Sequence, residues 1–292
     1  MSVLDGDTTS SPPPPPSRTS PPHPPVIPAG TPPSTPPDEP VHPRFGRVGI
    51  VPWSFGQTWR GVAATLIPWV AFLLISANAA PQTTVSSGTL SPLEDAIGAV
   101  VFVIFTAIVE GAFLLAPGYY AVVRRAGATV REGLWALGFR RTPLLPAIGW
   151  VVGGLIVVYA ASVVYQDIIT RFSLGLHTNV DTLQQLGQHA PLTVIGTLIG
   201  AVFIAPFCEE IFFRGFTFAG FLRGMPVWAA VLLSALLFGI AHGDIGSFAL
   251  LFVIGVVLAV VRWRTGSIWP GMALHMANNA VAALVVVASL GH

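Results

Sequence analysis

Three charged side chains lie close together inside an apolar stretch of the sequence that runs from about Pro191 to Leu222. They are Glu209, Glu210 and Arg214. A charged side chain near the centre of a bilayer costs roughly 2.5–3.5 kcal/mol on insertion scales. A chain that places three of them in one apolar stretch must pair them inside the protein, and such groups are candidates for a functional site.

The whole chain has the composition of a protein that crosses a membrane several times. Of its 292 residues, 53% are hydrophobic and 9% are charged, whereas about 25% of the residues of a soluble domain are charged. About 20 apolar residues are needed to span the bilayer as a helix. We therefore predict an all-α fold, a polytopic transmembrane helix bundle of about seven membrane helices. The predicted spans are 59–80, 95–123, 144–165, 191–222, 227–242, 248–263 and 268–290.

The first 43 residues differ from the rest, because they are rich in proline, serine and threonine and include the run Pro12 to Pro16. Such a segment has too little apolar surface to offset the entropy lost on ordering. We predict that residues 1–43 are a disordered, Pro-rich cytoplasmic tail. Residues 44–292 are then the transmembrane helical domain.

Arginines gather in the predicted loops on one side of the bundle, and the loops on the other side carry only Arg171. Positive side chains are enriched in cytoplasmic loops. This distribution predicts a multi-pass protein of the bacterial plasma membrane with a cytoplasmic N-terminus. In one arginine-rich loop, residues 130–139 are expected to form an extra interfacial helix with Leu134, Trp135 and Leu137 facing lipid.

The two adjacent glutamates are expected to have different roles. Successive residues of an α-helix turn by about 100°, so Glu209 and Glu210 point to different faces. Glu210 and Arg214 are four residues apart on one face and can form a buried ion pair as structural support. One guanidinium cannot neutralise two carboxylates, so Glu209 is left over. A spare buried carboxylate is a candidate functional group.

A histidine on the next predicted helix lies at the depth of this carboxylate. Glu209 and His242 are equally far along the sequence from the turn at 225–226. Two antiparallel helices joined at that turn bring both residues to the same depth, about 25 Å from the turn at 1.5 Å per residue. This spacing predicts that His242 faces Glu209.

The last predicted helix adds a second histidine and an amide, because His275 and Asn279 are four residues apart and share a face. On straight helices His275 lies roughly 10 Å nearer to the arginine-rich side than His242. A tilt or a non-helical start at residues 266–270 has to make up this difference.

Two kinds of hydrolytic chemistry suit these residues. Glu209 and His242 can deprotonate a water molecule that attacks a carbonyl carbon, while His275 and Asn279 stabilise the oxyanion. Alternatively, Glu209, His242 and His275 are the ligands of a catalytic zinc ion. The sequence leaves both open, although it lacks the HExxH motif of ordinary metalloproteases.

The three motifs occur in the order typical of one family. They are Glu209-Glu210-Ile-Phe-Phe-Arg214, Phe238-Gly-Ile-Ala-His242 and His275-Met-Ala-Asn-Asn279. In these residues the chain resembles the CPBP family of intramembrane proteases, which includes the type II CAAX prenyl endopeptidases and relatives of bacteriocin-immunity proteins. The resemblance covers about residues 192–290, within a predicted catalytic core at about 191–290.

The resemblance implies an endopeptidase that acts on a membrane protein or a lipidated peptide at the lipid bilayer. It assigns water activation to Glu209 and His242, and the oxyanion site to His275 and Asn279. The family was first described as metal-dependent, but a glutamate-based mechanism without metal is favoured. Prenylated substrates are a eukaryotic specialisation that this chain need not share.

Two other functions are compatible with the same residues. One is a catalytically silent immunity or scaffold protein, and the other is a proton-coupled transporter that uses Glu110, Glu209 and Glu210. A transporter is disfavoured because the sequence has no internal repeat. A nucleic-acid partner is not expected, because no basic cluster is interleaved with aromatic residues.

Two further residues of the apolar segments are less specific. Cys208 is expected to be a small packing residue rather than a nucleophile. Glu110 either forms a hydrogen bond within the bundle or points into the same cavity as Glu209.

Overall fold

The computed structural model describes residues 46–79, 90–125, 127–173, 186 and 188–289. The described residues belong to one compact unit and contain helices and no strands. The predicted tail at residues 1–43 lies outside them, as does most of the loop after the first helix. The all-helical fold is confirmed.

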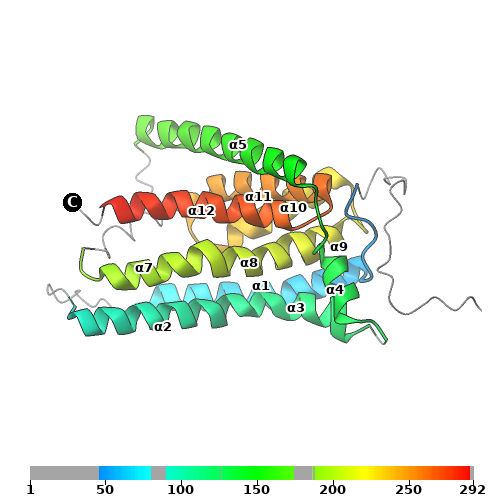
Figure 1. The fold of residues 1–292 in the computed structure, drawn as a ribbon, viewed down its shortest axis with the longest axis horizontal. Coiled ribbons are helices and arrows are strands. Elements are labelled where there is room, and N and C mark those ends of the chain that lie inside the picture. The colour runs from blue at the N-terminus through cyan, green and yellow to red at the C-terminus, as the bar shows by residue number, and fades with distance from the viewer. Residues whose placement is uncertain (1–45, 80–89, 126, 174–185, 187, 290–292) are drawn as a thin grey trace, which may run out of the picture. The chain divides into compact units, whose positions relative to one another are not determined.

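The helices run alternately up and down a bundle (Figure 1). In chain order they are α1 (Phe55–Ala79), α2 (Pro92–Gly111), α3 (Leu115–Gly118), α4 (Val130–Leu137), α5 (Leu144–Arg171), α7 (Pro191–Ile199), α8 (Ala205–Glu209), α9 (Ala219–Phe221), α10 (Val227–Ala241), α11 (Ile245–Thr265) and α12 (Trp269–Ser289). A short 3-10 turn (Ala112–Leu114) and three π-helical segments join some of them: η2 (Tyr119–Val123), η3 (Gly200–Ile204) and η4 (Glu210–Phe218).

Six of the resulting continuous helices are long and apolar enough to cross a membrane within the described part of the chain. The fifth predicted span, 227–242, is present as α10, which has 15 residues and is therefore about 22 Å long. This is shorter than the hydrocarbon core of about 30 Å. The chain is thus a polytopic bundle of six spans and one shorter apolar helix.

Helix α4 lies across the end of the bundle at which α1, α5 and α12 begin, and we call this the α4 end (Figure 1). Thr129 and Glu132 form a capping box at its start, and Gly138 ends it with a φ of 102°. Hydrogen bonds from the backbone and the side chain of Thr129 hold the pKa of the Glu132 carboxyl below its usual value. The predicted interfacial helix is therefore confirmed as a helix.

One detail of that prediction is wrong, because Leu137 is buried whereas Leu134 and Trp135 are exposed. The helix turns Gly133, Ala136 and Leu137 inward, as the three- and four-residue spacing of a helical face requires. Leu137 thus packs in the core rather than facing lipid.

The turn between α11 and α12 lies inside the protein at the α4 end. Ser267 and Ile268 are fully buried. The Ser267 hydroxyl donates to the carbonyl of Arg140 at 2.7 Å, and the Ile268 amide donates to the carbonyl of Gly138 at 2.9 Å. This turn moves the start of α12 deeper into the bundle than a surface loop would.

Helices α2 and α7 pack so closely that the contact requires glycine. A β-carbon at Gly196 would lie 2.5 Å from the carbonyl oxygen of Ala99, and one at Gly200 would lie 2.9 Å from Thr106. Small residues four apart allow this approach between membrane helices. At the start of α7, the Asp95 carboxylate accepts hydrogen bonds from the backbone amides of Leu192 and Thr193 at 2.8 and 2.7 Å; amides in the first turn of a helix have no acceptor within the helix.

We expect Gly196→Ala to lower the thermal unfolding temperature in detergent, because its β-carbon overlaps the α2 backbone. Overpacking of this kind costs about 1–3 kcal/mol. Gly149→Ala on α5 is the matched control, since its β-carbon meets open space and alanine is favoured over glycine in a helix by about 0.5–1 kcal/mol. The control should raise the unfolding temperature or leave it unchanged. Equal shifts of the same sign would contradict the close packing.

Candidate active site

The span from α7 to α9 is interrupted by two π-helical segments, η3 and η4. A π-helix bonds residue i to residue i+5, and such segments are frequent at functional sites. Proline at Pro206 also removes one backbone donor from this span. Side chains from other elements donate to three carbonyl oxygens of these π segments: Asn279 to Ala201 at 2.9 Å, Ser234 to Phe213 at 3.2 Å, and Trp53 to Phe216 at 3.2 Å. The irregular backbone thus accepts hydrogen bonds from α12, from α10 and from the segment that precedes α1.

Glu209 ends α8 and lies between two histidines from two other helices. Its Oε1 is 3.7 Å from Nε2 of His242, the residue that follows α10. Its Oε2 is 3.6 Å from Nε2 of His275 on α12. Glu209 is buried, with 7% of its surface exposed. The structure therefore brings three of the four predicted catalytic residues together.

The ring of His242 is oriented by the backbone of its own helix. Its Nδ1 lies 2.8 Å from the carbonyl oxygen of Phe238. A carbonyl can only accept, so this nitrogen carries the proton. In the neutral imidazole, Nε2 is then the unprotonated nitrogen that faces Glu209, and it can act as a base.

His275 contacts both glutamates. Its Nδ1 is 3.3 Å from Oε1 of Glu210, and its Nε2 faces Glu209. The predicted ion pair is confirmed, because Glu210 Oε1 is also 2.9 Å from the Arg214 guanidinium, with no exposed surface on either side chain. Glu210 therefore holds His275 as well as pairing with Arg214.

The depth difference of roughly 10 Å that straight helices give for His275 is made up in the structure, since His275 reaches Glu209. One reason is the buried turn at 266–268, which starts α12 deeper in the bundle. The other is η4, which follows Glu209 and has more residues per turn than the α-helix assumed in the prediction. The path from the α4 end to Glu209 is therefore shorter than 1.5 Å per residue implies.

The Phe238 ring packs against three of these polar side chains. The Arg214 guanidinium lies 4.2 Å from the ring centroid, in a geometry that gains cation–π energy. The rings of His242 and His275 lie edge-on to Phe238, with centroids at 4.7 and 5.6 Å. The sequence identified Phe238 only as part of a motif, and its packing role depends on contacts between helices.

Asn279 lies one turn after His275 on α12, as predicted, but its amide forms other contacts. Its Nδ2 donates to Ala201, and its Oδ1 accepts from Asn278 at 3.2 Å. The structure therefore places Asn279 between α12 and η3 and gives no direct contact with Glu209.

The unassigned Glu110 belongs to this region of the bundle. Its carboxyl lies close enough to Glu209 to interact with it electrostatically. Its Oε2 is buried and has no hydrogen-bond partner among the described residues. This favours the second of the two options from the sequence, in which Glu110 faces the cavity of Glu209. Cys208 is buried in the core, as expected of a packing residue.

The residues present do not fit a metal site as they are arranged. A catalytic zinc ion needs three protein ligands at about 2.0–2.2 Å from one point. Among the described residues, no group of three histidine, cysteine, aspartate or glutamate side chains has such an arrangement.

Comparison with known proteins matches this part of the chain to one family. Residues 191–281 match the family model described as "Type II CAAX prenyl endopeptidase Rce1-like". A Bacillus subtilis (strain 168) protein named "Putative membrane peptidase YdiL" is 28% identical over 115 residues, which cover 39% of this chain and 46% of that protein. An Escherichia coli protein named "Uncharacterized 24.3 kDa protein" is 28% identical over 153 residues, which cover 48% of this chain and 68% of that protein. No solved structure matches the chain significantly.

We expect Glu210→Ala to destabilise the protein strongly, because it leaves Arg214 charged, buried and unpaired. Loss of one partner of a buried pair costs about 3–5 kcal/mol. The measurement is thermal unfolding in detergent. Asp167→Ala is the matched control, since Asp167 and Arg171 have the same spacing and a 2.8 Å contact but are mostly exposed, and exposed pairs contribute at most about 1 kcal/mol. Similar losses in both variants would contradict a special role for the buried pair.

Proposed function

We propose that the chain is an intramembrane endopeptidase, because residues 191–281 match the Rce1-like family model and the three motifs resemble those of the CPBP intramembrane proteases. It hydrolyses peptide bonds with a water molecule activated by Glu209 and His242. The observation that carries the proposal is the position of Glu209 between two imidazole nitrogens from different helices.

The spacing of these groups suits a water molecule between them. Contacts of 3.6 and 3.7 Å are too long for direct hydrogen bonds, and polar groups at such a distance are commonly bridged by water. The water oxygen attacks the carbonyl carbon as one of its protons passes to Glu209 or to Nε2 of His242. When the C–N bond breaks, that proton passes to the leaving amine.

The same arrangement offers donors for the oxyanion. A doubly protonated His275 donates Nδ1–H to Glu210 and keeps Nε2–H for the negative oxygen. The Asn279 amide has two N–H groups, and only one is needed for Ala201. Each such donor contributes roughly 3–4 kcal/mol to the stability of a transition state.

The proposed substrates are membrane proteins or lipidated peptides, because Glu209 lies within an apolar span. A peptide bond must enter the bilayer region to reach it. Arg47, Arg140 and Arg223 lie at the α4 end, where Arg140 and Arg223 donate to backbone carbonyls of residues 47 and 51. We place this end at the cytoplasmic face of the plasma membrane, in line with the distribution of positive charge.

We expect Glu209→Gln and His242→Ala to remain folded and to lose at least about 100-fold of the cleavage rate, the lower range for general acid–base catalysis. The substrates are found by comparing the membrane proteomes of cells that express the native chain or Glu209→Gln. Cleavage of the identified substrates is then measured with purified protein in lipid nanodiscs. Identical proteomes and unchanged cleavage would favour a silent immunity or scaffold role. Unfolding of Glu209→Gln in detergent would instead indicate a structural glutamate.

Metal dependence is tested separately. We expect dialysis against EDTA and 1,10-phenanthroline to leave the cleavage rate within about twofold, because Glu209 and His242 activate water without a metal in this mechanism. The matched measurement adds zinc back to the dialysed protein. Loss of activity with chelator and its recovery with zinc would instead support Glu209, His242 and His275 as zinc ligands.

A further inference from the structure

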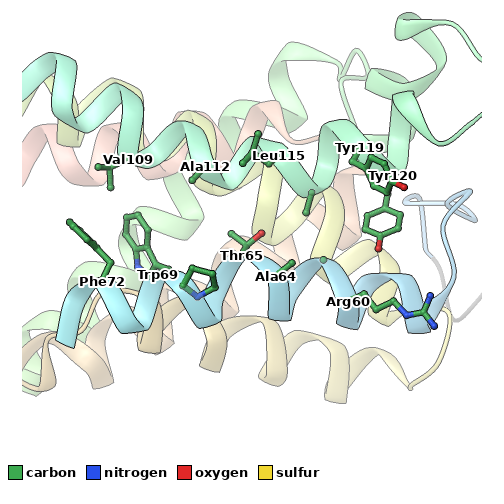
Figure 2. Close-up of a pocket in the computed structure, with 13 residues that line it drawn as sticks. Arg60, Ala64, Thr65, Trp69, Phe72, Val109, Ala112, Leu115, Tyr119 and Tyr120 are labelled. Atoms are coloured by element: carbon green, nitrogen blue, oxygen red, sulfur yellow. The ribbon is translucent and has the colours of Figure 1, made fainter. Parts of the chain in front are cut away.

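A hollow on the side of the bundle lies outside the site described above. It is a groove of about 650 Å³ between α1 and the elements α2, α3 and η2. Figure 2 shows its two walls, with Arg60, Tyr119 and Tyr120 at one end and Trp69, Phe72 and Val109 at the other. Between these ends its lining is formed mainly by small and apolar side chains.

The groove has the length of one bilayer leaflet. Arg60 and Phe72 are twelve positions apart on α1, which corresponds to about 18 Å along a helix. One leaflet is half of the hydrocarbon core, or about 15 Å. Leu115 is 72% exposed and Phe72 is 39% exposed, so the groove faces the surroundings of the bundle along its side.

The polar end of the groove carries the positive charge of Arg60. Arg60 is exposed, and within the described residues it takes part in no ion pair. It lies in the second turn of α1, near the α4 end, where the headgroup region of a bilayer begins. In Figure 2 the side chains of Tyr119 and Tyr120 lie on the opposite wall at the same end of the groove as Arg60. Arginine binds phosphate oxygens in a bidentate manner, and a tyrosine hydroxyl can add a hydrogen bond.

We propose that this groove binds one acyl chain of an anionic glycerophospholipid, with its phosphate at Arg60 and the tyrosine hydroxyls. The match of length selects an acyl chain from one leaflet. The Arg60 guanidinium, which has no ion pair in the part of the chain that the structure describes, selects a negative headgroup. A lipid with a positive headgroup has no favourable electrostatic interaction with Arg60. An uncharged lipid does not neutralise the guanidinium.

The apolar end of the groove adjoins the candidate active site. Trp69 lines the groove, and its indole N–H donates to the carbonyl of Ala241 at 2.6 Å. Ala241 directly precedes His242. Val109, also in the lining, directly precedes Glu110. A chain that fills the groove therefore packs against the residue that holds the end of α10 beside the site.

The test uses phosphatidylglycerol that carries a diazirine in one acyl chain, added to the purified full chain in detergent. After illumination, we expect cross-linked peptides to come mainly from α1 and α2–α3. Unlabelled phosphatidylglycerol should compete at least about fivefold better than phosphatidylcholine with the same chains, as expected for one arginine near a charged lipid. Glycerol phosphate, which has the headgroup phosphate but no chain, should not compete. Cross-links spread evenly over the helices would overturn the proposal. Competition by phosphatidylcholine or by glycerol phosphate as strong as that by phosphatidylglycerol would also overturn it.

Two pairs of variants locate the site. Arg60→Gln should lower the yield of cross-links about fivefold, whereas Arg131→Gln on α4, exposed and outside the groove, should not. Ala64→Phe fills the groove and should abolish the labelling of α1, whereas Ala63→Phe, exposed but outside the lining, should not. If each groove variant gave the same yield of cross-links as its control, lipid binding in the groove would be contradicted. Glu209→Gln should label like the native chain, so a failure of the proposed peptidase activity is distinguishable from a failure of lipid binding.

Discussion

Arg214 has no exposed surface, and it lies inside a helix bundle that offers few polar partners. Such a cation is tolerated only if a negative group lies beside it, and Glu210 does so at 2.9 Å. The Phe238 ring covers the guanidinium on another side. Because Glu210 also contacts His275, the ion pair fixes the imidazole that faces Glu209. The position of the candidate catalytic groups therefore depends on this one buried pair.

The backbone around this pair is irregular for a related reason. Apolar helices in a membrane gain little from the hydrophobic effect when they pack together, so close packing and hydrogen bonds between helices have more weight. The π segments η3 and η4 offer carbonyl oxygens to Asn279, Ser234 and Trp53. Each of these bonds joins the span of Glu209 to another part of the chain. The segments thus supply polar contacts where a regular α-helix has its carbonyls occupied.

Much of this arrangement could be predicted from the sequence, because hydropathy sets the spans and the charges within them are few. The pairing of Glu210 with Arg214 and the meeting of Glu209 with His242 followed from spacing alone. The reach of His275 did not, because it depends on a buried turn and on π-helical geometry that no spacing rule contains. The inward face of Leu137 and the bond from Asn279 to Ala201 depend likewise on which helices become neighbours.

The charged and polar groups around Glu209 also determine how a hydrolytic reaction could take place at this depth. Once Arg214 is paired with Glu210, the region still holds the carboxyls of Glu209 and Glu110 and two imidazole rings. Glu209 and the two rings lie 3.6–3.7 Å apart, beyond direct hydrogen-bond distance but within the reach of a bridging water. Polar groups spaced in this way make a small cavity favourable for water, because each water molecule needs two to four polar partners. Under the proposed function, the water molecule held by Glu209 and the two rings would be the nucleophile of peptide hydrolysis within an apolar span.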